Sequence, residues 1–195
     1  MTLRQGRAPR DRAPQDQLPH DPAPRDQARH EQARPDQGPL AERFTEAMSR
    51  LVSGVAVVSA RRADGRPCGL LVSSVCSYSV RPPSVLVALA RSSRTCRELD
   101  PRPGTAFGVH LLGAADADLA AVFAGGAEDK FTGLPWSWDD RVPRLLGVPV
   151  YLNCRTGAVF PHGDHVILVG EVGNCVLGEG EPLVYYRRRL DWRLG

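Results

Sequence analysis

Two histidines and an aspartate stand at the start of a dense apolar run, in the segment His162-Gly163-Asp164-His165 that precedes residues 166–169. The apolar run predicts a strand that is buried on at least one face, and the glycine predicts a turn before it. Because a buried strand holds the groups at its end rigidly, polar side chains there are well placed for binding or catalysis. An ordinary Gly-Asp hairpin with a solvated histidine on each side is the other interpretation.

Two clusters of hydroxyl residues are the next candidates for chemistry. Hydroxyls and backbone N–H groups at the start of a short helix can hold phosphate, and Arg94 or Lys130, the sole lysine of the chain, could add charge. A helix N-cap, which needs only one serine, is the alternative for the second cluster. For the first, the alternative is small residues in a strand that another group approaches closely. The clusters are Ser73-Ser74-Val75-Cys76-Ser77-Tyr78-Ser79 and Ser92-Ser93-Arg94-Thr95.

The composition limits the classes of protein to which the chain can belong. Its 195 residues suffice for one substantial domain with a tail, and its formal net charge of +3 is spread along the chain, unlike a nucleic-acid-binding surface. No apolar run approaches the roughly 18 residues that cross a bilayer, and the N-terminus has no signal-peptide pattern. The five cysteines lack metal-ligand spacing. We therefore expect a cytoplasmic protein with no metal site and with neither nucleic acid nor membrane as a partner.

The first part of the chain differs from the rest. Residues 7–36 form a degenerate five-residue repeat with recurring prolines, a period that matches neither a helix nor a strand. Such a segment cannot bury a continuous apolar face. We therefore expect residues 1–38 to be a disordered low-complexity tail rich in proline and arginine, and residues 39–195 to form the folded domain.

Strands dominate the pattern after residue 39. Helices are expected over residues 40–51 and 116–124, and a short helix is expected to end near residue 99. Many strands with hairpin-length connections indicate an antiparallel barrel or sandwich. The usual glycine-rich nucleotide-binding turns are missing from the sequence, so a nucleotide would have to bind without them. The expected strands cover residues 55–60, 68–79, 84–90, 105–112, 151–159 and 164–176.

The order of these motifs resembles the flavin reductase family, which has an FMN-binding split barrel and includes the small reductase components of two-component flavin-dependent monooxygenases. The similarity extends from about Phe44 to Tyr186 at ordinary spacing, and the ordered set of motifs is specific although each one alone is weak. The segments that carry it are Gly54-Val55-Ala56-Val57-Val58-Ser59-Ala60, Asp64-Gly65, Gly69 with Ser73-Ser74, Ser77-Tyr78-Ser79-Val80-Arg81-Pro82-Pro83, residues 92–95, Lys130-Phe131, and His162-Gly163-Asp164-His165 with Gly170-Glu171-Val172.

The resemblance implies a mainly β fold, a six-stranded antiparallel Greek-key split barrel with a few flanking helices. It implies a homodimer with FMN or FAD in a groove near the interface, NADH or NADPH as hydride donor, and a separate monooxygenase that receives reduced flavin. Leu71 and Val72 stand where many relatives have Thr and Ala, which leaves the choice of flavin open. The implied flavin-binding residues are Leu71, Val72, Ser73, Ser74, Ser77, Ser92, Ser93, Thr95, Lys130 and Phe131, and the implied nicotinamide-binding residues are Gly163, Asp164 and His165.

The residues themselves agree with this chemistry. Hydride transfer between two cofactors needs no nucleophile, because the protein only has to stack the reactants and exclude water. In the resemblance, His165 is the catalytic residue, either orienting the nicotinamide carboxamide or supplying a proton. Two alternatives remain open: a flavin-binding carrier or interaction protein with the same barrel but no activity, and a hydrolase that uses Cys76 with His165.

Overall fold

The computed structural model describes residues 38–192, so the tail expected over residues 1–38 lies outside the described residues except for Gly38. The expected domain division therefore stays a prediction. The helices are α1 (Gly38–Ser49), α2 (Arg94–Leu99), a 3₁₀ turn, η2 (Ala114–Asp116), and α3 (Ala117–Ala124). The strands are β1 (Ser53–Gly54), β2 (Ala56–Arg61), β3 (Pro67–Val72), β4 (Val75–Val80), β5 (Pro83–Ala90), β6 (Ala106–Leu111), β7 (Trp136–Asp139), β8 (Val142–Leu145), β9 (Val150–His162), β10 (His165–Leu177), β11 (Val184–Tyr186) and β12 (Arg189–Trp192).

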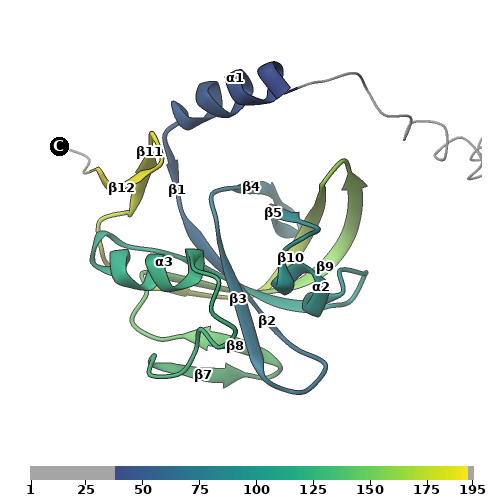
Figure 1. Cartoon of the computed structure of the whole chain (residues 1–195). Helices are drawn as coiled ribbons and strands as arrows, with labels where there is room; N and C mark the ends of the chain where they lie inside the picture. Colours follow the sequence, from purple (N-terminus) through teal and green to yellow (C-terminus); the bar gives the residue numbers. More distant parts are fainter. Residues whose placement is uncertain (1–37, 193–195) are drawn as a thin grey trace, which may run out of the picture. The chain divides into compact units, whose positions relative to one another are not determined.

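The central element is an antiparallel sheet in the order β3-β2-β6-β9-β10-β5-β4 (Figure 1). Its two edge strands, β3 and β4, follow each other in the chain and are separated only by Ser73 and Ser74. This bent segment pairs with β2 through one arm and with β5 through the other, which closes the sheet into a barrel with six strand positions. Because β6 returns beside β2 after the β2–β5 meander, the order is that of a Greek key.

The expected mainly β, antiparallel split barrel is confirmed, but the single strand expected over residues 68–79 consists of two strands. The bend between them is stabilised locally: the Ser74 hydroxyl donates a 2.6 Å hydrogen bond to the Ala88 carbonyl on β5. The Ala88 N–H in turn donates to the Ser74 carbonyl over 3.3 Å. A small hydroxyl residue therefore satisfies backbone groups that a sharp bend would otherwise leave unpaired.

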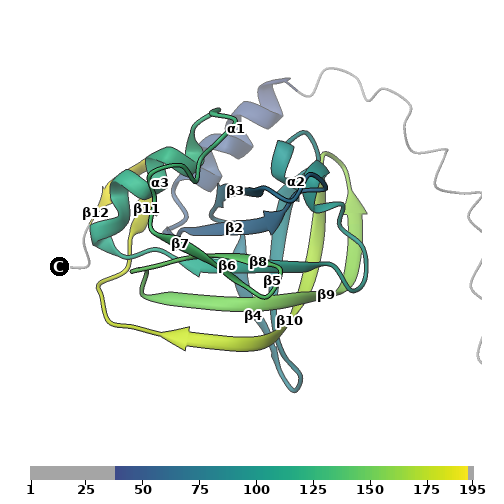
Figure 2. The ribbon, with the colours of Figure 1, turned by 90° about the horizontal axis from the view of Figure 1, so that it is seen from below.

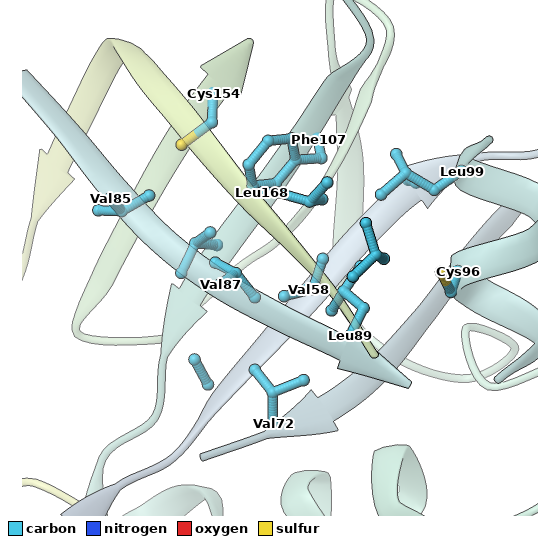
Figure 3. Packing of buried hydrophobic residues seen from close by; sticks show 14 of the residues in the cluster. Val58, Val72, Val85, Val87, Leu89, Cys96, Leu99, Phe107, Cys154 and Leu168 are labelled. Carbon is cyan, nitrogen blue, oxygen red and sulfur yellow. The ribbon is translucent and has the colours of Figure 1, made fainter. Parts of the chain in front are cut away.

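Strand β2 is buried on both faces and separates two apolar clusters. Ala56, Val58 and Ala60 face the barrel interior, where they pack with residues such as Phe107 and Leu168 (Figure 3). On the other face, Val57 and Val55, the residue just before the strand, pack beneath the elements that cover the barrel. These elements contribute Leu112, Ala120, Phe123, Phe131, Leu145 and Leu183 to the second cluster. Alternation along one strand thus builds both the barrel core and its outer layer.

Helix α3 and the β7–β8 hairpin form part of that outer layer. α3 contacts β3 and β2, whereas β8 contacts β6 and β2, and Figure 2 shows the hairpin beside β6. The sequence did not predict the hairpin, whose strands are only four residues each. Gly69 on β3 allows α3 to pack closely, since a methyl group there would lie 2.7 Å from the Phe123 ring.

Helix α1 has the expected amphipathic spacing, but within the described part of the chain its apolar side chains are not covered. Phe44 is 61% exposed, and Met48 is also exposed, as is Leu51 just after the helix. Strand β4 likewise exposes Tyr78 and Val80. Between residues 38 and 192 no helix is both long and apolar enough to cross a membrane.

Candidate functional site

Helix α2 begins with the hydroxyl cluster Ser92-Ser93-Arg94-Thr95. Ser93 is the N-cap: its backbone is extended, and its Oγ accepts a 3.1 Å hydrogen bond from the Cys96 N–H. Thr95 is buried, whereas Ser92 is exposed and its carbonyl accepts a 2.6 Å hydrogen bond from the Arg97 guanidinium. One serine therefore caps the helix, as one interpretation of the cluster required, and the other is free to take a different role.

A hollow of about 420 Å³ lies between α2, β3 and the end of α3. Four of the residues predicted to bind flavin line it: Leu71, Ser93, Thr95 and Lys130. The remaining wall is formed by the end of α3 and the loop that follows it, up to Lys130. Segments that are far apart in the sequence thus meet around one hollow.

Three cationic side chains line this hollow: Arg94, Arg97 and Lys130. Lys130 is half-buried, and its Nζ donates a 2.8 Å hydrogen bond to the Phe123 carbonyl at the end of α3. Burial lowers the pKa of Lys130, and the nearby charge of Arg94 lowers it further. Arg94 also donates a 3.4 Å hydrogen bond to the Ala127 carbonyl. Both cations are therefore fixed by backbone carbonyls on the wall of the hollow, which suits them to bind an anion.

Asp129 sets the direction of the chain on each side of Lys130. Its carboxylate accepts hydrogen bonds from the Phe131 N–H (2.8 Å) and from the Thr132 N–H and hydroxyl (3.1 and 2.6 Å). The hydrogen bond from the Thr132 hydroxyl is the main reason that the pKa of Asp129 is lowered. This turn sends Lys130 towards the hollow and Phe131 into the core.

Phe131 lies on the core side of the loop. Only 2% of it is exposed, and its ring packs edge-on against Phe123 and Trp136, with centroids 5.2 and 5.5 Å away. The side chain positions the loop that carries Lys130, and its ring is not part of the hollow's lining. This packing does not favour a contact between the Phe131 side chain and the flavin. The predicted contact stays a prediction.

The bent strand continues from the wall of the hollow. Leu71 lines the hollow, whereas Val72 points into the barrel core. Ser73 and Ser77 are exposed beyond the hollow, and the Ser74 hydroxyl is engaged with Ala88. The structure therefore connects these residues to the hollow through the bent β3–β4 segment without placing all of them inside it.

The His162–His165 segment forms the tight turn between β9 and β10. Gly163 has a φ of +57°, which favours glycine. His165 Nδ1 lies 2.8 Å from Asp164 Oδ1, and this hydrogen bond is the main cause of the lowered pKa of Asp164. Because the carboxylate can only accept, Nδ1 carries the proton, and Nε2 of a neutral His165 is free to accept a hydrogen bond.

Strand pairing connects this turn to the hydroxyl cluster at α2. His165 pairs with Ala90 at the end of β5, two residues before Ser92. The Arg91 N–H donates to the Asp164 carbonyl over 2.9 Å, and the Arg91 guanidinium contacts the Gly163 carbonyl over 3.3 Å. The two groups of candidate residues, about 70 positions apart in the sequence, therefore lie at the same end of the barrel.

The pairing rules out a Cys76–His165 dyad. Cys76 pairs with Leu86 on one side of β5, whereas His165 pairs with Ala90 on the other side. Four residues along a strand separate the two by about 13 Å even before the width of β5 is added. A nucleophile and its base need hydrogen-bond contact. Residues 38–192 also contain no cluster of His, Cys, Asp and Glu that could hold a metal ion.

Several residues of the hollow were not among those predicted from the sequence. Arg97, one turn after the cluster, was missed, as were the backbone of residues 68–70 and the loop over residues 125–128. A basic residue three positions after Arg94 on a short helix is a detectable signal, because both then lie on the same face. The loop wall has no comparable signal.

Comparison with known proteins assigns the chain to a family. Residues 48–192 match the model of the flavin reductase like domain, so the chain belongs to this family. Among curated relatives, the actinorhodin polyketide dimerase of Streptomyces coelicolor is 38% identical over 157 residues, covering 80% of this chain and 85% of the relative. The reductase component of 4-nitrophenol 4-monooxygenase/4-nitrocatechol 2-monooxygenase from Rhodococcus opacus is 36% identical, covering 75% and 78%.

Solved structures agree with this assignment. The styrene monooxygenase flavin reductase of Pseudomonas putida S12 superimposes with a TM-score of 0.67 at 29% identity, covering 75% of this chain and 94% of that one. The NADH:FAD oxidoreductase SgcE6 of Streptomyces globisporus C-1027, in complex with NAD and FAD fragments, gives a TM-score of 0.71 at 25% identity, covering 79% and 92%.

The donor set fits a flavin nucleotide. A flavin phosphate needs cations and hydroxyl or N–H donors, and the hollow offers Arg94, Arg97 and Lys130 beside Ser93 and Thr95. The ring system needs small side chains that let it approach backbone groups closely, and Ser73 and Ser74 offer these at the bend that follows Leu71, a residue of the hollow's wall.

Proposed function

We propose that this chain is an NAD(P)H-dependent flavin reductase that supplies reduced FMN or FAD to a separate flavin-dependent monooxygenase. The observation that carries the proposal is the cationic hollow at α2, joined by the β5–β10 pairing to the turn that presents His165. Membership of the flavin reductase family supports it.

In this proposal each group of residues binds one part of the reactants. Arg94, Arg97 and Lys130 hold the flavin phosphate, with the exposed Ser92 at the rim of the hollow. The backbone around Ser73 and Ser77 faces the flavin ring. Gly163 and Asp164 shape the turn, and His165 Nε2 accepts a hydrogen bond from the nicotinamide carboxamide. The bound flavin supplies the chemistry by accepting a hydride, so the protein has only to align the two rings and exclude water.

A steady-state matrix of NADH and NADPH against FMN, FAD and riboflavin tests the proposal. We expect nicotinamide oxidation, followed at 340 nm, to depend on added flavin and to favour flavins with a phosphate, because the hollow is cationic. The reductase proposal is refuted if no combination gives flavin-dependent oxidation. A carrier with the same barrel would bind flavin but leave it oxidised when NADH is mixed in anaerobically.

Replacing His165 by alanine should impair use of the nicotinamide more than binding of the flavin. Loss of one hydrogen bond worth about 1–1.5 kcal/mol predicts a rise of about tenfold in KM for NADH, with the Kd for flavin changing by less than about threefold. Steady-state kinetics and a fluorescence titration of flavin measure the two effects. His162→Ala, which truncates the exposed histidine at the other side of the turn, is the control and should change neither. If His165→Ala impairs nicotinamide use and flavin binding equally, His165 is a structural residue of the turn.

We propose that the protein is a homodimer. Its support is the exposed apolar surface of α1 at Phe44 and Met48 and of β4 at Tyr78 and Val80, since large uncovered apolar side chains on a monomer commonly mark an interface. Light scattering coupled to size exclusion should give twice the mass of one chain. The Tyr78→Ser/Val80→Ser variant should shift that mass towards the monomer, and a wild-type monomer would contradict the proposal.

A further inference from the structure

A second hollow, of about 810 Å³, lies beyond the C-terminal end of α2. Its walls are the end of β2, the loop between α2 and β6, the β7–β8 turn and β9, and it shares no lining residue with the hollow at Ser93 and Lys130. The charged residues that line it are Arg61, Arg62, Arg102, Arg141 and Arg155, together with Glu98, Asp100 and Asp140.

The carboxylates do not neutralise these arginines. Arg62 pairs with Glu98 over 3.5 Å, and Arg102 pairs with Asp100 over 3.5 Å. In contrast, neither Arg61 nor Arg141 has a carboxylate partner among residues 38–192. Five guanidinium groups and three carboxylates line the hollow. Arg62 also pairs with Asp64 and Glu128 outside the lining, so the uncompensated charge comes from the arginines that have no carboxylate partner in the described part of the chain.

The wall that carries these charges is held by hydrogen bonds. The Gly104 N–H donates to the Thr156 carbonyl over 2.7 Å, and the Thr156 N–H donates to the Thr105 carbonyl over 2.8 Å. Arg155 donates a 2.9 Å hydrogen bond to the Gly104 carbonyl. At the end of β2, the Arg61 guanidinium lies 5.6 Å from the centre of the Trp138 ring on β7. The guanidinium groups are thus presented from a loop and strands that are already ordered, which reduces the cost of binding.

We propose that this hollow binds a small polyanion that carries adjacent phosphate groups, with Arg61 and Arg141 as its principal ligands. Guanidinium groups bind phosphate oxygens through paired, charge-assisted hydrogen bonds. Two arginines without a carboxylate partner, one at the end of β2 and one in the β7–β8 turn, suit an anion with more than one charged group better than a monoanion. This binding site lies outside the hollow assigned to the flavin and does not depend on the proposed reductase activity.

Titration calorimetry with inorganic pyrophosphate at low ionic strength tests the proposal on the full chain. We expect one saturable site per chain, and we expect Arg61→Ser/Arg141→Ser to weaken it by about tenfold or more. The control is Arg43→Ser/Arg50→Ser, which removes the same charge from exposed positions on α1 and after it and should leave the affinity unchanged. ADP in place of pyrophosphate separates the sources of the anion: tighter binding identifies a nucleotide, and equal binding identifies the phosphates alone.

Three results would overturn the proposal. The first is the absence of saturable pyrophosphate binding to the wild-type chain. The second is an equal loss of pyrophosphate affinity in Arg43→Ser/Arg50→Ser, which would show that the affinity depends only on the overall charge of the protein. The third is a loss of pyrophosphate affinity in Arg94→Ser/Arg97→Ser alone, which would place the anion in the hollow assigned to the flavin. Circular dichroism of every variant separates loss of binding from loss of folding.

Discussion

Replacing Arg62 by methionine should weaken flavin binding, although we assign Arg62 no contact with the flavin. Its guanidinium lies 3.3 Å from Asp64, 3.5 Å from Glu98 on α2 and 3.8 Å from Glu128 in the loop after α3. The side chain is only 12% exposed, so these charges interact with less screening than at an open surface. Because α2 and the loop form two walls of the hollow, Arg62 holds those walls at a fixed separation.

The expected size of the effect follows from the number of partners. Methionine preserves much of the packing of the arginine stem, but it leaves Glu98 without its cation and Asp64 and Glu128 with Arg66 alone. We expect the Kd for flavin to rise about tenfold and the free energy of unfolding to fall by about 1–3 kcal/mol. Fluorescence titration and urea unfolding measure the two quantities. High salt should narrow the gap in affinity between wild type and variant, since it screens the wild-type pairs.

Arg66 offers a matched control on the same turn. It pairs with Asp64 over 2.9 Å and with Glu128 over 3.8 Å, but its side chain is 57% exposed. Exposed ion pairs contribute about 0–1 kcal/mol, so Arg66→Met should change flavin affinity by less than about threefold. If both variants behave alike, Arg62 does not position the walls of the hollow.

The fold was largely predictable because strand burial leaves a direct signal in the sequence. The dense apolar runs at β5 and β10 and the turn at Gly163 predicted elements that the structure confirms. The break at Ser73-Ser74 was not predicted, because residues on both sides of it have strand character and only the pairing with two different neighbours separates the arms. The β7–β8 hairpin was missed for a related reason: strands of four residues give too few positions for alternation to be recognised.

The candidate site was predictable in its residue types but not in its side-chain directions. Hydroxyls near Ser93 and a lysine at residue 130 were identified, and the structure brings them to one hollow. Phe131 was grouped with Lys130, yet adjacent residues can point to opposite sides of a loop, and here the Asp129 turn sends Phe131 into the core. Ser74 was treated as a ligand, whereas its hydroxyl is engaged with the neighbouring strand. Such assignments depend on tertiary contacts that no local pattern encodes.

His110 should make the stability of the protein fall as the pH is lowered from about 6.5 to about 4. The side chain is fully buried between β2 and β8: its Nε2 accepts a 3.0 Å hydrogen bond from the Leu145 N–H, so Nδ1 carries the proton and donates to the Val57 carbonyl over 3.2 Å. Burial lowers the pKa of His110 to about 4, and the charge of Arg144 acts in the same direction. Tyr151, stacked on the ring with centroids 4.9 Å apart, adds no compensating charge.

The direction of this pH effect follows from the number of protons that the folded and the unfolded chain bind. In the unfolded chain the histidine takes up a proton below about pH 6.5, whereas in the folded chain it stays neutral down to about pH 4. The stability due to this group is therefore complete above pH 6.5 and is lost progressively as the pH falls to 4. At about 1.4 kcal/mol per pKa unit, the loss over this window is about 3 kcal/mol. Urea unfolding at a series of pH values measures it.

His110→Gln isolates this contribution. An amide can donate to the Val57 carbonyl and accept from the Leu145 N–H, as the neutral imidazole does, but it does not titrate. The free energy of unfolding of the variant should therefore change much less between pH 6.5 and 4.5. Carboxylates with a lowered pKa, such as Asp129 and Asp164, affect stability mainly at lower pH. His162→Gln, at an exposed position, should keep the wild-type slope. If His110→Gln also keeps that slope, the buried imidazole is not the group whose protonation destabilises the fold.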